Sequence, residues 1–256
     1  MEGVDGAAHP PAPPPGLVGG ELMAWLRARY SPSRVLDYRE AKGLMFSEID
    51  RDASGMVEGL YSGNEVYIPG DLDSLDAAMA AFDTGAGYNA EHIYPQSKLK
   101  RARALWAVSD LHHIFPARVK PNAIRGNHSF TALAEDSVSI DGDGRALPPD
   151  PDPEPSPEPA APTEDAAAQV KFDHLLTTDP HSSSYNTRGF TPRPEVKGDV
   201  ARAVFYIQCI YGDKLRNPRN PNLSHSDRSF FPGMAGTLRR WHEADPVTEA
   251  ELARLG

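Results

Sequence analysis

The residues best suited to chemistry lie in the segment YNAEHIYPQS, residues 88–97, in which Glu91 is followed directly by His92. The neighbours Ile93 and Tyr94 are typical of a buried strand, where successive side chains point to opposite faces. A carboxylate is a good ligand for a hard cation, and an uncharged imidazole can take a proton from water. The pair therefore predicts a metal ion and a general base that act from different directions.

The residues that follow supply further parts of such a site. The first strand is predicted over residues 88–94, and SDLHHIF, residues 109–115, predicts a second strand that ends at a proline. Pro121 is suited to the first position of a short helix. Asn122 and Arg125 share one face of that helix because they are three residues apart. Two strands and a helix would bring a carboxylate, an imidazole, an amide and a guanidinium into one compact group.

These side-chain types together favour hydrolysis of a phosphodiester. Glu91 and Asn122 offer the oxygen ligands that Mg²⁺ prefers, and Mn²⁺ and Ca²⁺ would fit the same ligands. The unperturbed pKa of His92, about 6.5, suits a general base, so activity should rise between about pH 6 and 8. Arg125 is expected to act on phosphate as a catalytic cation, with a plain ion pair to Asp110 or Glu91 as the alternative.

Charge is distributed unevenly along the chain. The net charge of −10 argues against general attraction to nucleic acid or to an anionic membrane. Residues 98–128, however, contain seven cations and one anion, Asp110. Six of these cations are candidates for contact with nucleic acid: Lys98, Lys100, Arg101, Arg103, Arg118 and Lys120. The alternative for KLKRARALWAV is an amphipathic helix that buries Leu99, Leu105 and Trp106 and leaves its cations in solvent.

The flanking segments predict the elements that position this group. Apolar residues recur at helical spacing over residues 22–26, 36–49 and 72–82, and a hairpin is predicted within residues 55–70. A further helix is predicted from Asp199, as N-cap, to Gly212, as the residue that ends it. Thr248 and Glu251 predict a capping box at the start of a last helix.

The sequence predicts an α+β fold, a single mixed α/β domain around a strand–strand–helix metal site with flanking helices. Residues 1–19 are expected to form a disordered Pro-rich tail, and residues 20–256 the domain, interrupted by a disordered acidic insertion at 141–169.

Cys209 is the sole cysteine, so no intrachain disulfide can form. No secretory signal or run of about 18 apolar residues is visible. We therefore expect no contact with a membrane and, as the sequence stands, a location in the cytoplasm. A monomer is the expected oligomeric state.

Other kinds of site are less well supported. DRDASG imitates the start of a calcium loop at Asp50 and Asp52, but its twelfth position is Tyr61 where glutamate is required, so we predict a turn. A zinc hydrolase would use Glu91, His92 and one of two adjacent histidines as ligands. A binding module without catalysis would need the cations alone. These two classes remain as alternatives.

Four segments resemble the bacterial endonuclease I family of ββα-metal nucleases: NAEHIYPQS, SDLHHIFPARVKPNAIRGNHSF, PEVKGDVARAVFYI and RRWHEADPVTEAE. The resemblance implies that Glu91 and Asn122 bind the metal and that His92 is the general base. It also implies a set of residues around the metal, namely Asp110, His112 and His113; Asn127, at the end of the helix, is expected to lie with them.

The implied enzyme is a Mg²⁺-dependent endonuclease that cleaves DNA, with RNA as a further substrate, and leaves 5′-phosphate ends. Contacts to the phosphate backbone imply little sequence preference and a strong dependence on salt. Members of that family are often exported, and some contain disulfides, whereas this chain shows neither feature.

Overall fold

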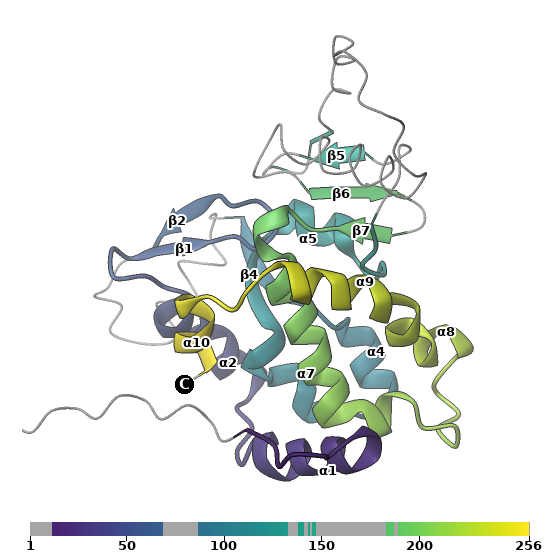
Figure 1. Ribbon diagram of the computed structural model, residues 1–256. Coiled ribbons are helices and arrows are strands. Elements are labelled where there is room, and N and C mark those ends of the chain that lie inside the picture. Colours follow the sequence, from purple (N-terminus) through teal and green to yellow (C-terminus); the bar gives the residue numbers. More distant parts are fainter. Residues whose placement is uncertain are drawn as a thin grey trace, which may run out of the picture.

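The computed structural model of the 256-residue chain describes residues 12–68, 87–132, 138–140, 143, 145–146, 183–186 and 189–255. Helices surround small antiparallel sheets, which confirms the predicted α+β class (Figure 1). The helix predicted over residues 72–82 and nearly all of the segment 141–169 lie outside the described residues. Within the described ranges, no helix combines the length and the apolar character needed to cross a bilayer.

The centre of the fold is a hairpin followed directly by a helix. Strands β3 (Tyr88–His92) and β4 (Ile114–Arg118) pair antiparallel, with Glu91 opposite Phe115. Helix α5 (Val119–Arg125) starts at the end of β4 and contacts both strands. The predicted order of strand, strand and helix is therefore confirmed.

The second strand begins later than the sequence predicted. Residues 105–113 form two 3₁₀ turns, η2 (Leu105–Ser109) and η3 (Leu111–His113), and only Ile114 starts the strand. The reason is a side-chain cap, because the Asp110 carboxylate accepts the backbone N–H of His112 at 3.1 Å and so stabilises a turn. Two prolines also differ in place: Pro116 lies within β4, and Pro121 lies in the first turn of α5.

The basic segment does not form one amphipathic helix. Helix α4 (Gln96–Arg101) ends where Arg103 takes a positive φ of 56°, and η2 follows. Leu105 and Trp106, expected to be buried if the segment were a helix, are exposed instead. A residue with positive φ commonly ends a helix, because this conformation turns the chain away from the helix axis.

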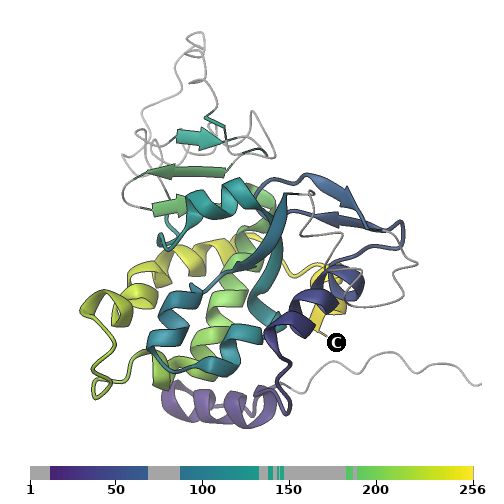
Figure 2. The same cartoon turned by 180° about the vertical axis from the view of Figure 1, so that it is seen from behind.

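The β3–β4 hairpin separates two apolar clusters. One face packs with the long helix α7 (Lys197–Leu215) and with α9 (Phe230–Ala244), which contact each other closely in Figures 1 and 2. The other face packs with Met45, Phe46, Val57 and Ile68. Because side chains alternate along β3, Asn89 and Glu91 face the first cluster and His92 faces the second.

Helix α7 is longer than the sequence predicted. It continues through Gly212 to Leu215, which is 1% exposed, because the apolar stripe extends for one more turn. Asp199 lies inside the first turn, where it pairs with Arg202, and is not the N-cap. Helix α9 was not predicted at all, since the one proline and two glycines in FFPGMAG are poor helix signals.

The remaining elements are small. Strands β1 (Met56–Glu58) and β2 (Glu65–Tyr67) form the predicted hairpin, and β5 (Val138–Ile140), β6 (Ser183–Asn186) and β7 (Gly189–Thr191) form a separate sheet. The other helical elements are α1 (Gly19–Tyr30), α2 (Tyr38–Leu44) with a π-helical turn η1 (Met45–Ile49), η4 (Pro194–Val196), α8 (His225–Arg228) and α10 (Glu249–Leu255).

Two local predictions are confirmed. Asp52 accepts the backbone N–H groups of Ser54 and Met56 through Oδ1, which makes DRDASG a turn. Thr248 and Glu251 form a capping box at the start of α10, each side chain accepting the backbone N–H of the other residue.

Candidate active site

Glu91 is held inside the fold by two partners on one of its carboxylate oxygens. The Tyr61 hydroxyl donates to Oε1 at 2.6 Å, and Nη1 of Arg125 lies 3.0 Å from the same atom. Burial raises the pKa of the Glu91 carboxyl, and the charge of Arg125 and the hydrogen bond from Tyr61 offset only part of that effect. With Oε1 engaged in this way, Oε2 is the candidate ligand atom.

Asn122 reaches the same face of β3 from helix α5. Its Nδ2 donates to Oδ1 of Asn89 at 2.6 Å, and Asn89 shares its strand face with Glu91. An Asn122 amide that donates through nitrogen keeps its oxygen as an acceptor. Magnesium takes one or two protein oxygens and retains water molecules for the rest. Glu91 and Asn122, on adjacent elements, therefore fit a magnesium ion by donor type and by face.

His92 projects from the opposite face of β3, and its ring is held in one orientation. Nε2 lies 3.0 Å from the carbonyl oxygen of Val108, so this nitrogen carries the proton and Nδ1 carries the lone pair. The ring packs between those of Tyr38 and His113, with centroids 5.5 Å away in each case. His92 is 7% exposed, and the half-exposed Tyr38 lies next to it at the surface.

Burial lowers the pKa of His92 to about 4, an effect that exceeds the opposing hydrogen bond to Val108. The imidazole is therefore already uncharged at pH 6. The premise that His92 titrates between pH 6 and 8 is therefore replaced by titration at a lower pH.

Asp110 organises the turn beside His92. It accepts hydrogen bonds from the hydroxyls of Tyr206 at 3.0 Å and Tyr211 at 2.7 Å, and lies 2.8 Å from Nδ1 of His112. Burial alone would raise the pKa of Asp110, but the hydrogen bond and charge of His112 lower it overall. His113 is fully buried, with Nε2 2.6 Å from the carbonyl of Ala107. One histidine of the pair thus points inward.

Arg125 lies in the interior and not at the surface. It is 1% exposed and donates to the backbone carbonyls of His92 at 2.9 Å and of Ile93, besides pairing with Glu91. The expected contact with phosphate is therefore replaced by the alternative, an ion pair with Glu91. The physical reason is the helix face: Arg125 is four residues from the buried Pro121 and so faces the core, over the ring of Phe130.

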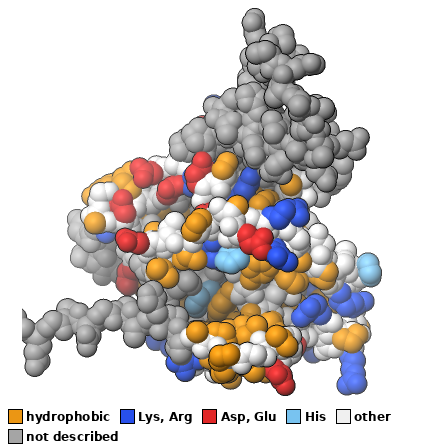
Figure 3. Space-filling view, in the orientation of Figure 1, with side chains coloured by type: hydrophobic (Ala, Val, Ile, Leu, Met, Phe, Trp, Pro, Cys, Tyr) orange, Lys and Arg blue, Asp and Glu red, His pale blue; other side chains and the backbone are white. Residues whose placement is uncertain are grey.

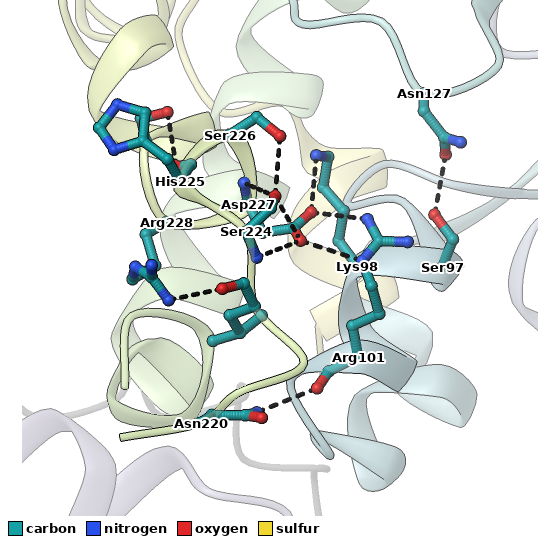
Figure 4. Close-up of polar contacts among 12 residues, drawn as sticks. Ser97, Lys98, Arg101, Asn127, Asn220, Ser224, His225, Ser226, Asp227 and Arg228 are labelled. Carbon is teal, nitrogen blue, oxygen red and sulfur yellow. Dashed lines mark hydrogen bonds and ion pairs between the residues drawn. The ribbon is translucent and has the colours of Figure 1, made fainter. Parts of the chain in front are cut away.

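Two of the predicted nucleic-acid contacts instead anchor helix α8. Lys98 is buried, and its Nζ lies 3.1 Å from Oδ1 of Asp227, which also accepts from Nη2 of Arg101 at 2.6 Å (Figure 4). The hydrogen bond from Arg101, together with those from Ser224 and Lys98, holds the pKa of Asp227 well below its usual range. Sequence position could not reveal this pairing, because Asp227 lies more than one hundred residues further along the chain.

The other predicted cations lie nearer to solvent. Lys100 and Lys120 are exposed, as is Arg103, whereas Arg118 pairs with Asp143. Asn127 is also exposed, and its Oδ1 accepts from Ser97 at 3.3 Å. On the face seen in Figure 3, Lys and Arg side chains gather toward α8 and the loop before it, and Asp and Glu side chains toward β1 and β2. The exposed cations there are Arg216 and Arg219 of that loop and Lys214 in the last turn of α7.

Three residues of the site were not identified from the sequence. Asn89 could have been, because it lies two residues before Glu91 and alternation places both on one strand face. Tyr61 and Tyr38 come from distant segments, and nothing in their local sequence marks them as neighbours of Glu91 and His92.

The zinc arrangement considered above is not formed. Glu91 and His92 project to opposite faces of β3, and His113 is engaged by a backbone carbonyl. In the part of the chain that the structure describes, no three Asp, Glu, His or Cys side chains are grouped so that they could hold a metal ion.

Comparison with known proteins places the chain in a family. The family model for endonuclease I matches residues 22–150 and 174–255. An extracellular ribonuclease of Bacillus subtilis (strain 168) is 27% identical over 245 residues, which cover 93% of this chain and 67% of the relative. An extracellular ribonuclease of Bacillus amyloliquefaciens is 27% identical over 169 residues, which cover 65% of this chain and 45% of the relative. The chain thus spans less than half of one relative and two thirds of the other.

Proposed function

The chain belongs to the endonuclease I family, and from that premise we propose that it is a Mg²⁺-dependent endonuclease that hydrolyses phosphodiester bonds of both RNA and DNA. Family membership supports a nuclease. The printed name of both relatives, extracellular ribonuclease, favours RNA as a substrate. DNA remains a substrate in this proposal because backbone contacts through cations do not distinguish the two sugars.

The observation that carries the mechanism is the orientation of His92. The carbonyl of Val108 holds the proton on Nε2, and the lone pair on Nδ1 can accept a proton from water. Val108 therefore acts as the residue that selects the tautomer. The neighbouring rings of Tyr38 and His113 keep the imidazole from rotating away.

Glu91 and Asn122 would hold the metal from one face of the hairpin. A bound magnesium ion would neutralise charge that develops on the phosphate oxygens and on the departing 3′ oxygen. Cleavage on that side of phosphorus leaves a 5′-phosphate. The ion pair with Arg125 and the hydrogen bond from Tyr61 favour the ionised form of Glu91 and fix its orientation, since both partners contact Oε1.

The test is a cleavage assay on supercoiled plasmid and on a linear RNA, each with Mg²⁺ and with chelator. We expect the plasmid to be nicked and linearised, the RNA to be degraded, and both reactions to stop in chelator. Product ends that a ligase can join without kinase treatment would show the 5′-phosphate. Failure to cleave either substrate with Mg²⁺ or Mn²⁺ would leave a binding module as the better description.

A matched pair of variants tests the ligand assignment. Asn122→Ala removes the proposed amide ligand from a half-buried position, so the fold should persist while cleavage in limiting Mg²⁺ falls sharply. Asn222→Ala, at an exposed position remote from the hairpin, serves as the control. Recovery of the Asn122→Ala rate at high Mg²⁺ would show that metal binding, and not the chemical step, has been weakened.

A further inference from the structure

The turn η2 presents two large apolar side chains to solvent beside the candidate active site. Leu105 and Trp106 are 61% and 54% exposed. The same turn supplies the two carbonyls that orient the histidines, Ala107 for His113 and Val108 for His92. The exposed tryptophan is therefore attached to the backbone that positions the proposed general base.

Trp106 also lines a cavity of about 150 Å³ between η2 and the segment that joins α1 to α2. Pro32, Val35 and Leu36 form part of its apolar wall, and its polar edge comes from Arg34, Ser109, Asp110 and His112. The His112 ring is fixed, because it stacks on Tyr206 with centroids 4.2 Å apart and an interplanar angle of 16°. A small cavity with an aromatic wall, an apolar side and a polar edge suits a planar heteroaromatic ligand that also carries hydrogen-bonding groups.

Exposed cations precede Trp106 by a few residues in the chain. Arg103 is exposed and keeps a positive φ of 56°, a conformation that favours glycine and that side chains rarely adopt. Lys100 is also exposed, and its Nζ hydrogen-bonds the neutral side chain of Gln96. Residues 96–109 include no anion. Exposed aromatic rings with adjacent cations are the combination by which proteins bind single-stranded nucleic acid.

We propose that Trp106 and this cavity form a stacking site for an unpaired base of the substrate, with Arg103 on the adjoining phosphate. The proposal rests on the proposed nuclease function and names its substrate class, single-stranded nucleic acid. Trp106 and Val108 are two residues apart, at most about 7 Å of chain, so the base belongs to a nucleotide close to the bond that is cleaved. In a duplex each base is stacked on its neighbours, and the ring of Trp106 has no free face to meet.

The test compares kcat/KM on a labelled single strand and on the same strand within a duplex, for RNA and for DNA. Stacking on one aromatic side chain predicts that Trp106→Ala loses about 5- to 150-fold on the single strand, with a much smaller change on the duplex. Leu105→Ala is the control, because Leu105 is equally exposed on the same turn but does not line the cavity. Trp106→Phe should retain most of the activity.

Binding gives a readout that does not depend on cleavage. In chelator, an oligothymidylate should quench the tryptophan fluorescence of the wild-type protein, and Trp106→Phe should lose that quenching. Arg103→Gly should weaken this binding and yet raise the urea midpoint of unfolding, since glycine accepts the positive φ without strain.

The outcomes separate the stacking site from the nuclease function. A wild-type protein that cleaves, together with a Trp106→Ala variant that is folded and unchanged on single strands, would overturn the stacking site and leave the nuclease standing. An equal loss on single strand and duplex would overturn it as well. A wild-type protein that cleaves nothing would refute the nuclease function, and absence of quenching would then refute the stacking site independently.

Discussion

The ion pair between Arg125 and Glu91 allows a quantitative prediction. Both side chains are nearly fully buried, and Arg125 also donates to the carbonyls of His92 and Ile93. Replacing Arg125 by methionine keeps the apolar stem but leaves a buried carboxylate without its counter-ion. Removal of one partner from a buried pair costs about 3–5 kcal/mol. Since whole domains are stable by about 5–15 kcal/mol, the unfolding midpoint in urea should fall by roughly a fifth or more.

The double variant Arg125→Met with Glu91→Gln isolates the charge effect. It removes both charges and keeps a side chain that can accept from Tyr61, so it should be more stable than Arg125→Met alone by about 1–3 kcal/mol. Arg239→Ala breaks an exposed pair with Glu243 and should leave the midpoint unchanged. Arg125→Met with the stability of the wild type would refute the buried, structural role of this arginine. If Arg125→Met instead lost affinity for nucleic acid and kept the stability of the wild type, Arg125 would have to be assigned to contact with phosphate.

Three further predictions concern pH, a buried anchor and the turn beside His92. Because the pKa of His92 is about 4, protonation of this imidazole should not change the single-turnover cleavage rate between pH 6 and 8, and the rate should fall as the pH approaches 4. A steep rise in the rate between pH 6 and 8 that follows the titration of His92 would contradict the lowered pKa. In the unfolded chain His92 and His113 become protonated near pH 6.5, whereas in the folded chain they do so only near pH 4 and pH 3. Their contribution to stability is therefore lost as the pH falls from about 6.5 toward these values. Circular dichroism must accordingly show a folded protein at each pH of the assay. Asp227→Ala should lower the free energy of unfolding by about 3 kcal/mol or more by leaving Lys98 buried and unpaired, whereas Asp213→Ala, at an exposed pair with Arg27, should change it little in the same urea titration. Asp110→Asn should weaken the hydrogen bonds from Tyr206 and Tyr211 and lower kcat more than it raises KM, because it disturbs the turn that carries Val108; an effect on KM alone would argue against this role.

Local patterns predicted the parts of the fold that depend on local interactions. Alternation around Glu91 gave the strand, Asn122 lies on the predicted helix, and the capping box at Thr248 formed as expected. The second strand was misplaced because a single side chain, Asp110, caps a turn where hydrophobic alternation alone indicates a strand. Helix α9 was missed because its packing against α7 outweighs its weak intrinsic propensity.

The roles of charged residues were harder to predict than the elements that carry them. Lys98 and Arg125 lie in the most basic part of the chain, which suggests a solvated or phosphate-binding surface. Each is instead buried against a carboxylate from another element, Asp227 and Glu91 respectively. A sequence shows which side chains are charged, but the partner that makes burial of a charge possible is decided by tertiary contacts.

The most direct test of the proposed mechanism is single-turnover cleavage of RNA and DNA in Mg²⁺ by His92→Ala, measured beside its affinity for the same substrates. The variant should bind both nucleic acids as the wild type does, since His92 is buried and its substitution leaves the surface cations in place. Its cleavage rate should fall by about 10²- to 10⁴-fold, the usual contribution of a general base. A folded His92→Ala variant that cleaves at the wild-type rate would contradict the assignment of this imidazole as the group that activates water.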